Sequence, residues 1–263
     1  MNHFSKTELI RRLREISQRG WITSSRGRND GALGNTLEDL LGIEENNLPI
    51  PNANEWELKT KRIGTTSLTT LAHPEPSPRG LHIVPHCLLP NYGWPHQHAG
   101  TKYPASELSF RATLTHNQRT DRGFCFKVDR NTRRLVVSFD SLVVDSRHST
   151  WRHTVASRTG LGELDPQPYW GFDDLAAVLR VKLCNAFYVE AAHRRLDTIE
   201  QFWFRRVTIL TSFSFNSFLN LAEQGAVKID FDARTGHNHG TKFRISSLYF
   251  TSLYESTELA LNS

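Results

Sequence analysis

Charged and apolar residues alternate in the segment Trp56-Glu57-Leu58-Lys59. If this segment is a strand, Glu57 and Lys59 project from one face, because successive side chains alternate across a strand. A carboxylate can hold a hard cation through oxygen, and the cation lowers the pKa of a bound water. A neighbouring lysine can orient that water or stabilise negative charge on a phosphate. The pair therefore suits metal-assisted phosphodiester cleavage, although an exposed strand with an ordinary ion pair has the same spacing.

Two other positions are expected to lie near this pair. Glu38 borders the apolar stripe of a short helix predicted over 36–41, so we expect it to be partly buried. Asn52 lies five residues before Glu57, in the segment that leads into the predicted strand. Glu55 would share the strand face of Glu57. Oxygen ligands from the helix, the loop and the strand would then meet at one strand end.

The stretch from Gly34 to Arg62 resembles the active-site region of the MvaI/BcnI type of restriction endonuclease. That group is related to the mismatch-repair nicking enzyme MutH, within the PD-(D/E)xK nuclease superfamily. Its pattern is Pro-Asp-x4-Glu-x-Lys, preceded by a helix glutamate in a Glu-Asp-Leu-Leu or similar sequence. The resemblance covers most of the chain and rests on Glu38-Asp39-Leu40-Leu41, Glu45-Asn46-Asn47-Leu48, Glu57-Leu58-Lys59-Thr60, 124–139, 170–190 and 237–245.

The resemblance implies that Glu38, Asn52, Glu57 and Lys59 are catalytic, with Asn52 and Glu57 as metal ligands. The expected cofactor is Mg²⁺, which Mn²⁺ or Ca²⁺ could replace in a crystal. This sequence has Asn52 where the family has aspartate. An amide oxygen can ligate a cation but brings no negative charge. Three explanations stay open: an inactivating change, a natural tolerance, or replacement of the aspartate by Glu55.

Donor-rich side chains are concentrated in the run from Arg234 to Arg244. Histidine and arginine there could contact base edges or phosphates, and the resemblance implies base recognition by a loop in this region. A polar turn or a His-x-His metal pair are the alternatives. The candidate DNA-binding residues are Arg26, Arg28, Lys61, Arg234, His237, His239, Lys242 and Arg244.

Composition places few limits on function. The 263 residues carry a net charge of +5, which permits nucleic-acid binding without requiring it. The cysteines are Cys87, Cys125 and Cys184; they are far apart and odd in number, so we expect small core residues in a reducing, cytoplasmic setting. We see neither a secretory signal nor an apolar run long enough to span a membrane.

The expected elements mix helices and strands. We predict a functional loop or an insertion over 73–104, where the Tyr92, Trp94, His96 and His98 cluster is more simply explained by packing. Helices are predicted over 6–18, 36–41 with Asn35 as N-cap, 172–181, 213–223 and the C-terminal end. Strands are predicted over 56–63, 67–71, 109–115, 124–128, 135–139, 186–191, 201–210, 227–231 and 241–245.

These elements predict an α/β fold. The resemblance makes it restriction-endonuclease-like (MutH-like): a mixed sheet flanked by helices, in one nuclease domain over 1–263. Its two lobes, 1–140 catalytic and 141–263 mainly for DNA recognition, would form a DNA-binding cleft. The implied function is that of a type II restriction endonuclease cutting double-stranded DNA at a short, nearly palindromic, GC-containing site. The expected protein is a monomer with a cognate DNA methyltransferase in the cell. A MutH-like nicking enzyme and a catalytically silent DNA-binding protein, because of Asn52, are the alternatives.

Overall fold

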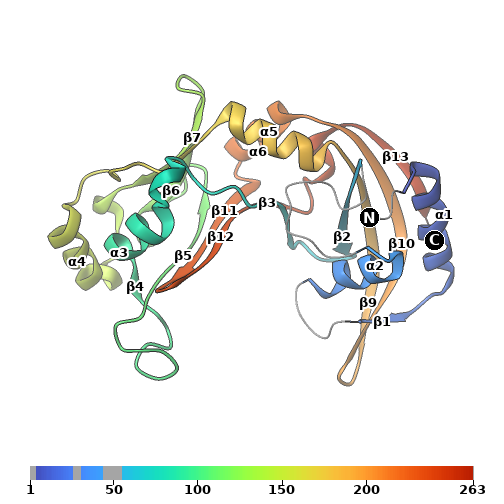
Figure 1. The fold of residues 1–263 in the computed structure, drawn as a ribbon, viewed down its shortest axis with the longest axis horizontal. Coiled ribbons are helices and arrows are strands. Elements are labelled where there is room, and N and C mark those ends of the chain that lie inside the picture. Colours follow the sequence, from blue (N-terminus) through green and yellow to red (C-terminus); the bar gives the residue numbers. More distant parts are fainter. Residues whose placement is uncertain (1–3, 26–30, 44–54, 263) are drawn as a thin grey trace. The chain divides into compact units, whose positions relative to one another are not determined.

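The computed structural model describes residues 4–25, 31–43 and 55–262. By contacts, the chain divides into unit 1 (1–69, 178–217 and 246–263) and unit 2 (70–177 and 218–245). Figure 1 follows the elements in sequence colours. The division differs from the predicted lobes, since residue 140 lies inside unit 2 and unit 1 gathers three separate segments. Within the described residues, no helix combines the length and apolar character needed to cross a bilayer.

Unit 1 is built on a mixed sheet. Its order is β1-β10-β9-β2, and β13 also pairs with β10. The pairing of β2 with β9 is parallel, and the other pairings are antiparallel. The strands are β1 (Ile22–Thr23), β2 (Trp56–Arg62), β9 (Asn185–Leu196), β10 (Ile199–Phe213) and β13 (Tyr254–Asn262).

Two helices of unit 1 share a core with this sheet. The helix α1 (Lys6–Gln18) begins at Ser5, whose side chain accepts a hydrogen bond from the Glu8 amide, and α2 (Ala32–Leu41) follows. Apolar residues from both helices form one buried cluster with one set of alternating strand residues. The members include Leu9, Leu13, Leu33, Leu37, Trp56, Leu58, Phe187, Val189, Phe202 and Phe204.

Unit 2 contains a second sheet, with the order β3-β12-β11-β5-β4. Along β11, Val227, Ile229, Phe231 and Ala233 are buried, whereas the alternate residues are partly exposed. One face therefore packs into a core, and the other carries polar side chains. The strands are β3 (Leu68–Ala72), β4 (Trp94–Pro95), β5 (Leu108–Thr115), β11 (Val227–Arg234) and β12 (His237–Ser246).

The remaining elements include a small antiparallel sheet of β6 (Phe124–Asp129), β7 (Arg134–Phe139) and β8 (Tyr169–Gly171). The helices are α3 (Leu89–Tyr92), α4 (Ser149–Thr159), α5 (Phe172–Leu183) and α6 (Phe215–Glu223). Short turns are 3-10 at Arg79–Leu81, Ser141–Val143, Ser146–His148 and Thr251–Leu253, and π at Val84–Leu88. The α5 and α6 helices each cross a unit boundary.

The predicted helix over 6–18 and the predicted strands are confirmed, most with shifted ends. The predicted C-terminal helix is wrong, because β13 occupies that segment. The predicted cap at Asn35 is also wrong: α2 begins at Ala32, with Gly31 as N-cap. The expectation of three core cysteines holds for Cys125 but not for Cys184, which is exposed.

The predicted loop over 73–104 contains defined elements. Within it, Tyr92 and His96 are 5% and 6% exposed, and Trp94 stacks near Phe110 with ring centroids 5.5 Å apart. The packing explanation of this aromatic cluster is therefore confirmed for these three residues, whereas His98 is exposed.

Candidate active site

The Glu57 carboxylate lies in unit 1, on the sheet face opposite the core that contains Trp56 and Leu58. In the parallel register, Glu57 is paired with Ala186 and Lys59 with Tyr188 on β9. The Glu57 side chain is 1% exposed, and the Lys59 Nζ donates to its Oε1 at 2.7 Å. The predicted shared face of Glu57 and Lys59 is therefore confirmed. An exposed strand bearing an ordinary ion pair is excluded by the burial.

A second lysine approaches the same carboxylate oxygen. Lys182 lies in the last turn of α5, and its Nζ is 3.6 Å from Glu57 Oε1. Its side chain is 17% exposed. Lys182 was not among the predicted site residues, because the predicted helix stopped at residue 181 and the lysine is far from Glu57 along the chain. No local pattern marks it; only the pairing of β2 with β9, which follows α5, could have pointed to it.

The site is electrostatically unusual, because two ammonium groups surround one buried carboxylate. Glu57, Lys59 and Lys182 together carry a formal charge of +1, and Glu38, whose charge also acts on Lys182, brings the total to zero. Burial lowers the pKa of Lys182, an effect that Glu57 opposes and Lys59 reinforces. Two ammonium groups beside a buried carboxylate can donate to an anion that binds next to them.

Glu38 is positioned by α2 and acts on the same cluster. It is partly buried, as predicted, and its charge raises the pKa of Lys182, against the larger effect of burial. The helix ends just beyond it in a Schellman arrangement: the Ile43 amide donates to the Glu38 carbonyl at 2.9 Å and the Gly42 amide to the Asp39 carbonyl at 3.1 Å. Gly42 has a φ of 69°, the left-handed conformation that glycine adopts at low cost. This cap fixes the end of the helix that carries Glu38.

The structure ties the other candidate residues of the active-site region less closely to Glu57. Asn52, Arg26 and Arg28 lie outside the described residues. Glu55 is exposed, in the turn that precedes β2. Lys61 is partly buried on β2 and is paired in register with Glu190 of β9.

Tyr254 also belongs to this region of unit 1 and was missed by the sequence analysis. It is 8% exposed, and its hydroxyl has no hydrogen-bond partner within the described part of the chain. Burial raises the pKa of Tyr254, and the nearby negative charge of Glu57 raises it further. A buried donor without a partner among the described residues is therefore within electrostatic reach of Glu57.

These residues fit a cation that is held by few protein oxygens. Mg²⁺ usually keeps several waters and binds through one or two carboxylates together with substrate phosphate. Glu57 supplies one buried carboxylate, and Glu38 supplies a second acidic group to the same cluster. Across residues 4–25, 31–43 and 55–262, no group of three or more His, Cys, Asp or Glu side chains is arranged as a metal cage. The His237 and His239 pair, considered above as a metal site, therefore has no third such ligand in these ranges.

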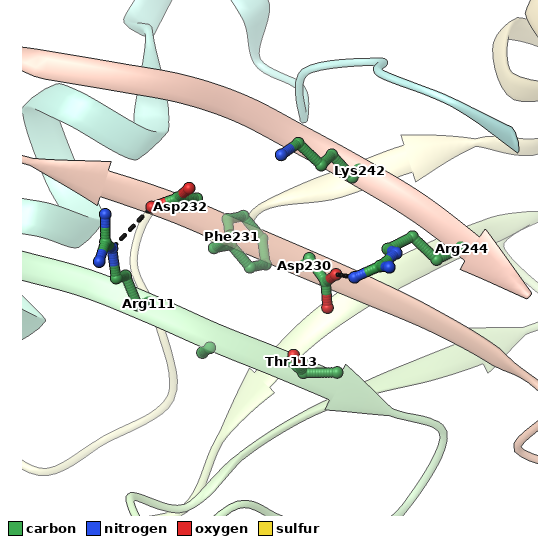
Figure 2. A pocket seen from close by; sticks show the side chains of 8 residues that line it. Arg111, Thr113, Asp230, Phe231, Asp232, Lys242 and Arg244 are labelled. Atoms are coloured by element: carbon green, nitrogen blue, oxygen red, sulfur yellow. Dashed lines mark hydrogen bonds and ion pairs between the residues drawn. The ribbon is translucent and has the colours of Figure 1, made fainter. Parts of the chain in front are cut away.

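A polar hollow of about 360 Å³ opens on the second sheet, in unit 2. Figure 2 shows its charged side chains on three neighbouring strands, β5, β11 and β12. Arg111 Nε contacts Asp232 Oδ1 at 2.7 Å, and Arg244 Nη1 contacts Asp230 Oδ2 at 2.8 Å. Lys242 projects from β12 beside these pairs. The hollow therefore offers both donors and acceptors on one sheet face.

The predicted recognition run begins at the end of β11 and continues through β12. Arg234 contacts Glu107 Oε1 at 3.0 Å and lies over the Tyr103 ring. His237 and His239 are exposed, with ring centroids 4.2 Å apart. The run is thus the turn and second strand of a β-hairpin. The strand predicted over 241–245 is confirmed, whereas the expectation of a loop or polar turn is wrong for 237–240, which belong to β12. The structure brings Lys242 and Arg244 together at the hollow, on alternate positions of β12.

Comparison with known proteins supplies independent information. The model of the MvaI/BcnI restriction endonuclease family matches residues 10–254. The solved complex of restriction endonuclease MvaI with its cognate DNA substrate is 22% identical, with a TM-score of 0.77, over 98% of this chain and 100% of that one. MvaI in the absence of DNA is 21% identical, with a TM-score of 0.54, over 99% and 100% of the two chains. These likenesses show the fold. Among curated proteins, none matches significantly.

Proposed function

The chain belongs to the MvaI/BcnI restriction endonuclease family, and we propose that it cuts duplex DNA at a short, GC-containing site with Mg²⁺. The observation that carries the proposal is the buried Glu57 carboxylate with Lys59 at 2.7 Å. A buried carboxylate with an ammonium group beside it suits a phosphodiester and a cation bound together. We also propose that the enzyme acts as a monomer and has a cognate DNA methyltransferase in the cell.

The chemistry assigned to each residue follows from its charge and position. Glu57, with Asn52 or Glu55, would hold Mg²⁺, which supplies an activated water and neutralises charge on the phosphate. Lys59 orients the water or donates to the phosphate oxygen on which charge develops. Glu38 adds a negative charge that acts on Lys182. Hydrolysis adds the elements of water across one P–O bond, so no further reactant is required.

The polar hollow of unit 2 is proposed to read base edges. Guanine presents acceptors in the major groove and cytosine a donor, so arginine–aspartate pairs can match a G·C pair. Arg244, Lys242 and the exposed His239 supply donors on β12, and Asp230 supplies an acceptor on β11. Arg26, Arg28, Lys61, Arg234 and His237 remain proposed DNA contacts.

The direct test is digestion of a sequenced plasmid by the purified chain with Mg²⁺, followed by sequencing of the ends. Cuts in both strands at one recurring short sequence, abolished by a chelator, are the expected result. Cutting of one strand only, dependent on a mismatch and an added partner protein, would instead indicate a MutH-like nicking enzyme. Binding without cutting at any metal concentration would indicate a silent DNA-binding protein.

His239→Ala and Arg244→Ala are each expected to weaken specific DNA binding by about 1–3 kcal/mol and to relax discrimination at one base pair. The measurement is binding to a set of duplexes with single base-pair changes. His153→Ala, an exposed histidine on α4, is the matched control. If both variants keep wild-type affinity and specificity, this face does not read the sequence. If the variants instead lose metal binding, measured by calorimetry without DNA, the histidine pair would be a metal site.

Asn52→Asp is expected to raise the cleavage rate and lower the Mg²⁺ concentration needed for half-maximal rate. A second carboxylate holds a hard cation better than an amide, because it adds a full negative charge. The measurement is a metal titration of the initial cleavage rate for both chains. If Glu55 replaces the family aspartate, Glu55→Gln silences the natural chain instead. Full activity that neither change affects would show that position 52 is not a metal ligand here.

A further inference from the structure

We propose that the tip of the β9–β10 hairpin is a further DNA-binding element, which contacts duplex DNA outside the cleaved site. The inference rests on the proposed function and extends it to the DNA that flanks the site. Its basis is a two-stranded ribbon of unit 1 that continues past β2 (Figure 1) and holds Arg194 in a fixed position on one side.

The ribbon begins where the neighbouring strands end. β2 pairs with β9 only as far as Ala191, and β1 pairs with β10 only as far as Gln201. Beyond these points β9 and β10 pair with each other as far as Leu196 and Ile199, and residues 193–199 are all exposed. A two-stranded ribbon fits the major groove of DNA, and its twist lets it follow a helical surface.

The side of the ribbon that carries Arg194 continues the sheet side of the active site. The irregularity in the pairing of β9 with β10 adds its extra residue to β10, so side chains alternate without interruption along β9. Arg194 is therefore on the same side of that strand as Ala186, the register partner of Glu57. The two β9 positions are about 26 Å apart, which corresponds to roughly eight base pairs of duplex. DNA cut at Glu57 would thus meet Arg194 beyond a short recognition site.

Arg194 is held in place and has donors to spare. Its guanidinium lies 4.3 Å from the centroid of the Trp21 ring, and its Nε donates to Gln201 Oε1 at 2.8 Å. Trp21 in turn packs near Trp203, with ring centroids 5.9 Å apart. Among the described residues, neither Nη1 nor Nη2 of Arg194 has a hydrogen-bond partner. A fixed guanidinium that presents both of these groups can bind two oxygens of one phosphate.

Protection of an exposed strand edge does not account for this arrangement. Charged side chains discourage the pairing of exposed strands with other chains, but that role requires neither a fixed orientation nor a particular side. The paired residues on the side of Arg194 include no carboxylate: they are Ala192, Arg194, Leu196, Ile199, Gln201 and Trp203. Leu196 and Ile199, at the tip, are 50% and 48% exposed and can contact thymine methyl groups. A basic and apolar side without acidic groups is complementary to DNA.

The test compares Arg194→Met, which removes the charge, with the control Arg195→Met on the opposite side of the ribbon. Binding without metal is measured by fluorescence anisotropy on two labelled duplexes centred on the site that plasmid digestion identifies. One has about 10 base pairs, too few to reach Arg194, and the other has about 30. For Arg194→Met we expect about 3- to 10-fold weaker binding of the long duplex and a salt slope lowered by about 1, without effect on the short duplex. We expect Arg195→Met to match wild type on both duplexes.

Wild-type binding of the long duplex by Arg194→Met would overturn the inference. So would a loss that affects both duplexes alike, or one that Arg195→Met shares. Arg194→Lys keeps the charge and is expected to restore most of the salt slope; a slope that stays low would show that Arg194 serves only to hold Trp21. If digestion finds no site, the long duplex is given a mixed sequence, because phosphate contacts do not depend on sequence. A loss confined to Arg194→Met would then support the ribbon contact although the cutting function had failed.

Discussion

Lys59→Ala is expected to slow DNA cleavage by about 10²–10³-fold while leaving specific DNA binding nearly unchanged. The reason is that Lys59 donates at 2.7 Å to the buried Glu57 carboxylate, where one charged donor contributes strongly to transition-state stabilisation. The rate is measured in a single turnover at saturating Mg²⁺, and binding is measured with metal withheld.

Lys127→Ala is a suitable control for this variant. Lys127 is also a strand lysine, but it is exposed on β6 in unit 2. We expect the control to cleave at the wild-type rate. If Lys59→Ala also did so, Lys59 would be a structural partner of Glu57 rather than a catalytic group. If Lys59→Ala lost DNA binding and cleavage in equal proportion, Lys59 would contribute only to binding of the ground state.

The local part of the site could be predicted from sequence. The alternation over 56–59 determines which side chains share a face, and the pairing of Glu57 with Lys59 follows directly from a period of two. The partial burial of Glu38 followed in the same way from the apolar stripe of its helix. Both inferences use neighbours along one element, where geometry is fixed by the backbone.

The non-local part could not be predicted. Lys182 reaches Glu57 because β9, which follows α5, pairs in parallel with β2, and that pairing is invisible in either segment alone. Tyr254 is near Glu57 because the C-terminal segment adds to β10 as a strand. Because a helix was predicted for that segment, Tyr254 was not expected near Glu57. The division into two units could not be predicted for the same reason, because unit 1 combines three segments that are separated along the chain.

The run from Arg234 to Arg244 shows a different limit of prediction from sequence. Polar residues, two histidines and two glycines over 236–240 are typical of a turn, and the turn is real but short. Beyond it, Thr241, Phe243 and Ile245 alternate with Lys242 and Arg244 as a strand with one buried face. The strand predicted over 241–245 is therefore confirmed, whereas the polar residues over 237–240 favoured a turn although β12 already begins at His237. The alternation is what places Lys242 and Arg244 on the face with Asp230.

Glu57→Gln is expected to abolish Mg²⁺-dependent cleavage and to lower the free energy of unfolding by about 3 kcal/mol. The loss of stability arises because the change removes the buried carboxylate that contacts both Lys59 and Lys182, which are 15% and 17% exposed. The two ammonium groups would then repel each other without the carboxylate between them. Denaturant unfolding measures the stability, and plasmid digestion measures the activity.

Two comparisons separate the metal role of Glu57 from its structural role. Glu190→Gln, on the neighbouring strand β9, removes a carboxylate from a weaker pair with Arg206, whose side chain is 50% exposed. We expect a cost below about 1 kcal/mol and normal cleavage. Mg²⁺ should raise the melting temperature of the natural chain and of Glu190→Gln, because it binds the folded state, but not that of Glu57→Gln. A Glu57→Gln chain that still gains stability from Mg²⁺ would place the metal on other residues, and Glu57 would then serve to hold the two lysines.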